Sequence, residues 1–153
     1  MMSGAPTFQS ISQETLEEHK QIHFYLDQIS STLEGLGPDM ADSEPMRRLA
    51  AQIQGLKERL VEHHHAEEHD GLFQAILELL PDSRVEVDRL VKQHEEMINI
   101  LELAKIHAQH SEPVEAEALR VDMQKFLEMF RKHERDEDEL LRQALEREGK
   151  SVS

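Results

Sequence analysis

Histidine and glutamate recur in this sequence at a helical spacing that suits metal coordination. His64 precedes Glu68 by four residues, and His133 precedes Glu137 by the same interval. Residues four apart in a helix lie one turn apart on the same face, so an imidazole and a carboxylate there can reach neighbouring ions. In the other two helical segments, His19 and His94 each interrupt an apolar stripe. The predicted metal ligands are therefore His19, His64, Glu68, His94, His133 and Glu137.

Four long helices are predicted to carry these residues. Glycine and proline divide the chain into helical segments of about 10–34, 44–80, 83–110 and 113–149. The first segment begins at Ser10 or Ser12, and Gly71 is a mild weakness inside the second. Apolar residues recur at alternating intervals of three and four, which places them on one packed face. Short connections predict an all-α fold, an up-down-up-down antiparallel four-helix bundle. We expect one domain over 1–153, with flexible tails at 1–9 and 150–153.

The composition supports an all-helical chain and argues against several classes of protein. Hydrophobic residues make up 38% and charged residues 32%, with only 6 glycines and 5 prolines, which is too apolar for a disordered chain. Aromatic residues are only 4%, too few for a platform that stacks nucleic-acid bases or for a typical β-sandwich.

The charge and the missing cysteines restrict partners and ligands. A net charge of −15 repels phosphate backbones and anionic lipids, so we expect neither a nucleic-acid nor a membrane partner. Cysteine is absent, so nitrogen and oxygen atoms must hold any metal. The sequence has neither an apolar run of about 18 residues nor the pattern of a signal peptide at its N-terminus. We therefore expect a cytoplasmic protein.

The predicted ligands lie at a similar depth in the bundle. Counted from the end where the first and third helices start, His19 lies about 8 residues in, His94 about 12, and both His-x-x-x-Glu pairs about 14. At ~1.5 Å per residue these depths are ~12, ~18 and ~21 Å, so the side chains form a layer. Four imidazoles and two carboxylates suit iron, manganese or zinc, and carboxylates from opposite helices can bridge two ions. We predict a carboxylate-bridged di-iron site, with a pH-sensitive polar layer as the alternative.

Two registers compete on the second helix. His63 with Glu67 continues the apolar stripe in the first half of this helix, which consists of Leu49, Ile53, Leu56 and Leu60. His64 with Glu68 lies between that stripe and the later one. Periodicity leaves both registers open, so His63 and Glu67 remain possible additional ligands or neighbours of the ligands.

The remaining histidines are less constrained by their spacing. His23 stands one turn beyond His19, and it is either a further ligand or a residue at the rim of the site. Four others are expected to face solvent: His65, His69, His107 and His110.

Residues 64–73 resemble the second-helix motif of hemerythrin-like proteins, the HHE cation-binding group: a histidine, three residues, a glutamate and then Leu-Phe. This resemblance favours His64 with Glu68 over the register one residue earlier. It assigns the other ligand positions of the family to His19 on the first helix, His94 on the third, and His133 with Glu137 on the last. It covers nearly the whole chain and implies a four-helix bundle with a non-haem di-iron centre.

The sequence departs from oxygen-carrying hemerythrins at two positions. Those proteins have a second histidine four residues after the one on the third helix, where this chain has Ile98. Their last-helix carboxylate is an aspartate five residues after the histidine. Here a glutamate stands four residues after it, and Asp138 is a second candidate acid. A fifth histidine would come first from His23 and second from His63. A missing ligand leaves a position for water or peroxide, which argues against reversible oxygen carriage.

Three kinds of function are compatible with such a centre. A module that binds or senses O2, NO or iron itself needs only the metal site, and it is our first expectation. The alternative is an enzyme whose open di-iron centre reduces peroxide or activates oxygen, with Glu67, Tyr25 or His63 moving protons nearby. The third is a structural metal site in a scaffold that binds another protein.

Overall fold

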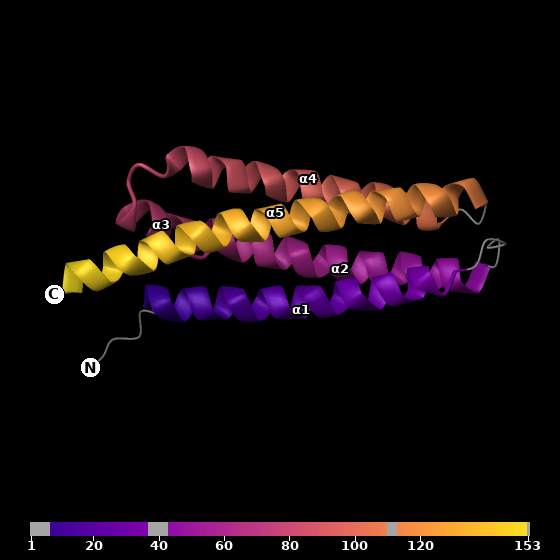
Figure 1. Cartoon of the computed structure of the whole chain (residues 1–153), viewed down its shortest axis with the longest axis horizontal. Coiled ribbons are helices and arrows are strands. Elements are labelled where there is room, and N and C mark those ends of the chain that lie inside the picture. The colour runs from indigo at the N-terminus through magenta and orange to yellow at the C-terminus, as the bar shows by residue number, and fades with distance from the viewer. Residues whose placement is uncertain (1–6, 37–42, 110–112, 153) are drawn as a thin grey trace.

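The computed structural model describes residues 7–36, 43–109 and 113–152, and its regular structure over these ranges is helical (Figure 1). The helices are α1 (Phe8–Glu34), α2 (Ser43–His69), α3 (Leu72–Leu79), α4 (Arg84–Ala108) and α5 (Pro113–Val152). None of the described helices has the length and apolar character needed to cross a bilayer. The predicted all-α fold is therefore confirmed.

The four long helices pack side by side as a bundle, with α3 at one end (Figure 1). α1 contacts α2 and α5, and α4 lies against the same two helices, so the contacts form a closed ring. Figure 1 shows the chain crossing the length of the bundle in alternating directions, so each long helix is antiparallel to its two neighbours in the ring. A closed ring of four helices gives every helix one inward face, which is where the predicted ligands are needed.

The second predicted helix is broken, whereas the apolar pattern predicted one continuous helix over 44–80. α2 ends at His69 and α3 begins at Leu72, with Gly71 between them at a φ of 117°. This φ lies in the left-handed region, which glycine adopts without the steric cost that other residues bear. The break allows α3 to turn its own apolar face into the bundle, independently of the face that α2 buries.

The helix ends extend further than the sequence predicted. Phe8, 4% exposed, begins α1 and packs into the core, so residues 8 and 9 do not belong to a flexible tail. Thr7 caps this helix, because its hydroxyl accepts a hydrogen bond of 3.0 Å from the Ser10 amide. At the other end α5 continues past Gly149 to Val152. Residues 1–6 and 153 of the predicted tails lie outside the described residues.

The buried apolar residues form two clusters with a polar layer between them. Along α4, Leu90 belongs to one cluster and Met97 to the other, and the buried His94 lies between them. Along α5, Phe130 and Leu140 belong to different clusters in the same way. The buried polar residues between the clusters are His19, His63, His64, Glu67, Gln93, His94, His133 and Glu137. The bundle therefore holds this layer between two hydrophobic regions that fix its helices.

Candidate metal centre

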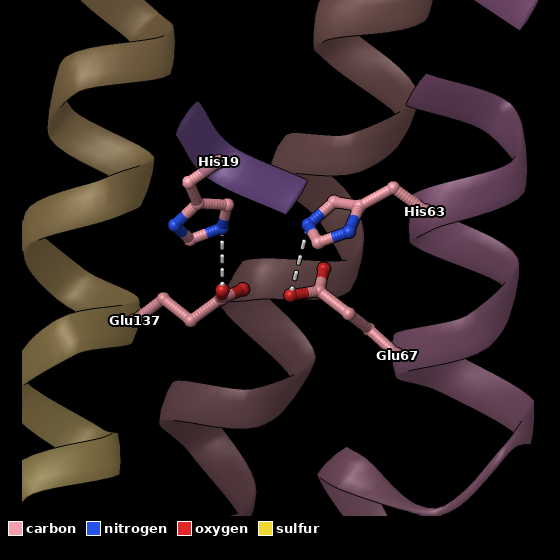
Figure 2. A group of neighbouring side chains, drawn as sticks. All are labelled: His19, His63, Glu67 and Glu137. Atoms are coloured by element: carbon pink, nitrogen blue, oxygen red, sulfur yellow. Dashed lines mark ion pairs between the residues drawn. The ribbon is translucent and has the colours of Figure 1, made fainter. Parts of the chain in front are cut away.

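Two overlapping groups of side chains in this layer have the composition and spacing of metal sites. The first group is His19, His63, Glu67 and Glu137, and the second is Glu67, His94, His133 and Glu137. Within each group the potential ligand atoms lie within 4.8 Å of one another, and all of these residues are buried. Both groups contain Glu67 and Glu137, whose carboxylates point toward one another from α2 and α5 in Figure 2. The layer can therefore hold two neighbouring ions.

Glu67 directs one oxygen toward each group. Its Oε2 lies 3.2 Å from Nε2 of His63, and its Oε1 lies 3.1 Å from Nε2 of His94. His63 and Glu67 are one turn apart on α2, whereas His94 comes from the neighbouring α4. The carboxylate therefore spans the space between two imidazoles that belong to different groups, which is the placement of a bridging ligand.

Glu137 repeats this arrangement from the opposite side. Its Oε1 lies 3.1 Å from Nε2 of His19 on α1, and its Oε2 lies 3.2 Å from Nε2 of His133, one turn earlier on α5. Figure 2 shows His19 above Glu137 and His63 above Glu67, with the two carboxylates between the helices. The residues that would hold a metal are thus His19 and His63 in one group, His94 and His133 in the other, and Glu67 and Glu137 in both.

The outward nitrogens of two histidines of these groups have carboxylate partners. Nδ1 of His94 lies 2.7 Å from Oε2 of Glu68, and Nδ1 of His63 contacts Oε2 of Glu18. A carboxylate can only accept in such a contact, so each Nδ1 must donate and each Nε2 keeps its lone pair. These contacts select the tautomer that metal binding through Nε2 requires.

The outward nitrogen of His133 has a side-chain amide, not a carboxylate, as its partner. Nδ1 of His133 donates to Oε1 of Gln93 at 2.7 Å, and the amide nitrogen of Gln93 donates to Oδ2 of Asp136 at 3.2 Å. Lys132 also donates to this Asp136 oxygen, at 2.9 Å. His133 is therefore held at the end of a hydrogen-bonded chain that runs to the surface.

The outer contact of His19 is longer than the others, and its partner Glu134 also contacts His23. Nδ1 of His19 lies 3.7 Å from Oε2 of Glu134, too long for a hydrogen bond. Nε2 of His23 lies 2.9 Å from both oxygens of Glu134. His23 is thus a partner of Glu134 at the rim, and it does not join either group of potential ligands.

The four residues that contact the outward Nδ1 atoms of these histidines are arranged in the same way around the bundle. Each stands next in sequence to a ligand on its own helix, but it contacts the ligand histidine of the next helix in the ring. The contacts run from Glu18 on α1 to α2, from Glu68 on α2 to α4, from Gln93 on α4 to α5, and from Glu134 on α5 to α1. We call these four residues the outer ring. They connect all four long helices around the candidate centre.

Several polar atoms of the layer lack the partners that buried groups normally have. Both oxygens of Glu67, both oxygens of Glu137, and Nε2 of His19 and His63 have no hydrogen-bond partner among the described residues. Burying a carboxylate without compensation costs several kcal/mol. A cation bound among these atoms would remove that cost, so the donor set fits a metal.

The approach of two imidazole nitrogens gives a second test of this fit. Nε2 of His94 and Nε2 of His133 are 3.2 Å apart. When Nδ1 of an uncharged imidazole donates outward, the lone pair of the ring is on Nε2, so in these tautomers the two lone pairs face each other. A cation that accepts both lone pairs converts this repulsion into two bonds, so the second group also fits a metal.

Burial and neighbouring charges shift the pKa values of the layer in different directions. Burial and the negative charge of Glu137 raise the pKa of Glu67 well above its usual range. Burial would also raise the pKa of Glu137, but the imidazoles of His133 and His19 hold it well below its usual range. Burial, with the adjacent His133, lowers the pKa of His94 to about 3, so this imidazole is neutral. Neutral imidazoles and an ionised carboxylate are the forms that bind metals.

The metal ligands predicted on α2 do not belong to the two groups, whereas those predicted on the other helices do. His19, His94, His133 and Glu137 all belong to the two groups. On α2, however, His63 and Glu67 take the positions for which the resemblance favoured His64 and Glu68. The signal for this register was the apolar stripe of α2, which His63 and Glu67 continue.

His64 and Glu68 lie beside the two groups. His64 is 5% exposed, and its ring stacks on that of His94 with centroids 3.7 Å apart. Its Nε2 has no hydrogen-bond partner among the described residues, and burial lowers its pKa far below the usual range. Glu68 belongs to the outer ring. The second candidate acid of α5, Asp138, is exposed and outside both groups.

The histidines expected at the surface differ in their exposure. His65 and His69 are exposed on α2, as predicted. His107 is only partly exposed, because its Nδ1 lies 2.5 Å from Oδ2 of the buried Asp122 on α5. His110 lies outside the described residues.

Comparison with known proteins agrees with this geometry. A family model described as the hemerythrin HHE cation binding domain matches residues 10–145, a range that contains every residue of both groups and of the outer ring. No curated protein and no solved structure matches the chain. The resemblance found in the sequence is therefore confirmed at the level of the family.

Proposed function

The chain belongs to the hemerythrin HHE cation-binding family, and we propose that it is a non-haem di-iron protein that binds or senses O2, NO or iron itself. The observation that carries this proposal is the placement of Glu67 and Glu137. Each directs its two oxygens toward histidines of different groups, at 3.1 and 3.2 Å. Two carboxylates in this position support a pair of bridged ions better than a single one.

The donor set supports iron and leaves room for an added ligand. Imidazole and carboxylate suit iron, with manganese and zinc as the nearest competitors. Two imidazoles and two bridging oxygens supply four ligand atoms to each ion, so positions remain for a small molecule. Iron bound there would supply the redox and ligand-binding chemistry, while the protein holds four imidazoles and two carboxylates in place and surrounds them with two apolar clusters.

Elemental analysis of the protein, as purified and after anaerobic addition of Fe2+, tests the proposal. We expect two irons per chain and an optical spectrum that changes when O2 or NO is added. Glu137→Gln should lose iron, because Glu137 contacts a histidine of each group. His65→Ala, a change of an exposed imidazole on α2, is the matched control and should keep both ions. One ion or none in the wild-type chain would contradict the di-iron centre.

A peroxide-reducing enzyme is the second candidate, and His64 favours it. This buried imidazole stacks on His94 and offers an Nε2 without a partner among the described residues, so it could donate to or accept from a small molecule bound nearby. Repeated consumption of peroxide by the iron-loaded protein would support the enzyme. His64→Phe keeps an aromatic ring against His94, so it should abolish this turnover while both irons stay bound.

A further inference from the structure

We propose that a pocket between α1 and the C-terminal end of α2 is the entrance through which divalent cations reach the metal centre. The charged residues that line it are Glu14, Glu18, Glu67 and Asp70. The pocket has a volume of about 160 Å3, enough for several water molecules and thus for a partly hydrated ion. This inference rests on the proposed metal centre, but it does not depend on which metal is bound.

The wall of the pocket is acidic, and the described residues that line it include no Lys, Arg or His. Its other lining residues are Ile11, Thr15, Ala66 and Leu72, none of which carries a charge. A concave surface lined by charges of one sign concentrates ions of the opposite sign and accelerates their association. The adjoining hollow shares Glu14 and Glu18 and adds Glu17 and Glu62, and Arg59 and His63 also line it. The acidic character thus extends along the face between α1 and α2.

The inner wall of the pocket is part of the metal centre itself. Glu67 lines the pocket although it is only 2% exposed, and neither of its oxygens has a hydrogen-bond partner among the described residues. The same carboxylate faces Nε2 of His63 and of His94. The side chain of Glu67 therefore separates a cation in the pocket from the centre, and its buried oxygens lie on the inner side of this wall.

The spacing of these acids is unfavourable for the helices that carry them. Glu14 and Glu18 are four residues apart on α1, and Asp70 follows Glu67 by three residues at the end of α2. Like charges at such spacings destabilise a helix, because they lie on the same face. A bound or passing cation offsets this repulsion. The break at Gly71 ends α2 next to Asp70, so the pocket opens where the helix stops.

A second cleft, between α2 and α4, also reaches the polar layer but is less suited to cations. It is lined by His64, His65, Glu68 and Glu95 among others, and it ends on His94. The carboxylate of Glu68 is already engaged by Nδ1 of His94 at 2.7 Å. The outward side of that imidazole carries its proton and therefore repels a cation. The pocket at Glu67 also has one engaged carboxylate, that of Glu18 beside Nδ1 of His63, but its wall contains two further acids, Glu14 and Asp70.

The rate of Co2+ binding to the full metal-free chain, followed by stopped-flow absorbance, tests the entrance. Glu14→Gln combined with Asp70→Asn removes two charges from the pocket and touches neither the two groups nor the outer ring. We expect the association rate to fall about tenfold and to depend less on salt concentration. The final stoichiometry and the melting temperature of the loaded protein should not change.

A matched variant removes the same charge elsewhere. Asp27→Asn with Glu128→Gln changes one exposed acid on α1 and one on α5, and neither lines the pocket. The proposal is overturned if this control slows binding as much as the pocket variant, because net charge would then be the cause. It is also overturned if the pocket variant binds Co2+ at the wild-type rate, or if only Glu95→Gln in the second cleft slows it. Failure of the metal centre itself differs from all of these, since the wild-type chain would then bind no Co2+.

Discussion

Replacing Gln93 tests whether the outer ring controls the metal centre. Gln93 is 8% exposed and His133 is 1% exposed, and the bond between them is 2.7 Å long. Gln93→Leu keeps the size of the side chain but removes the acceptor of the His133 Nδ1 proton. Holding His133 in its metal-binding orientation then leaves a buried N–H unpaired, which costs about 1–3 kcal/mol. This corresponds to a loss of about 5-fold to 150-fold in metal affinity.

Titration of the metal-free protein with Zn2+ in competition with a chelator measures this loss. The effect should fall on the ion held by His94 and His133, so one binding step weakens and the other stays close to wild type. Gln93→Glu should restore most of the affinity, because a carboxylate accepts the same hydrogen bond. A merely structural role for Gln93 predicts no such rescue, since Gln93→Glu places a second negative charge beside Asp136.

Gln124→Leu provides the matched control for this experiment. Gln124 is an exposed residue of α5 whose amide donates to Glu128 at 3.1 Å, remote from the two groups. Its replacement should leave both binding steps unchanged. Two binding steps of wild-type affinity in Gln93→Leu would refute the reasoning, as would a Gln93→Glu variant that binds no better than Gln93→Leu.

Three further predictions concern the glutamates of α2 and the glycines. Since the pKa of Glu67 is raised by burial in the folded protein, stability from its protonated form is present below about pH 4.5 and is lost as the pH rises. In urea unfolding without metal at pH 8, Glu67→Gln should therefore be more stable than wild type, and the order should reverse when metal is added. Glu68→Gln should keep both ions and lower the affinity about tenfold in a chelator titration, because Glu68 only orients His94. Gly71→Ala should lower the free energy of unfolding by about 1–2 kcal/mol, because φ is 117° there, whereas Gly149→Ala inside α5 should raise it by up to ~1 kcal/mol.

The fold and the inward polar residues of three of the four long helices could be predicted because the apolar patterns of these helices are uninterrupted. On α4 and α5 the apolar residues continue at intervals of three and four through His94 and His133. A ligand that replaces an apolar residue within such a stripe must face the core, whatever the tertiary contacts are. His94 and His133 were therefore assigned to the core from spacing alone.

The register of α2 could not be settled because the helix was predicted to be continuous to Leu80. Up to residue 67 the inward face runs through Leu60, His63 and Glu67, and after the break Leu72 belongs to a separate helix. On one straight helix, residues 64 and 68 lie between the inward face of the first half and that of the second half. Periodicity therefore leaves both registers open. The positive φ of Gly71 removes this constraint, since it lets α3 bury its own apolar face.

The periodicity of apolar residues does not predict the outer ring, but the antiparallel arrangement of the helices explains which residues form it. Neighbouring residues in a helix are rotated by about 100°, so the residue beside an inward ligand points toward an adjacent helix. Glu18 and Gln93 precede the ligands of α1 and α4, whereas Glu68 and Glu134 follow the ligands of α2 and α5. α1 and α4 run in the direction opposite to α2 and α5. Moving one residue back along α1 or α4 therefore turns the side chain in the same sense around the bundle as moving one residue forward along α2 or α5. The four contacts therefore close a ring, and Gln93 is the position where an amide replaces a carboxylate.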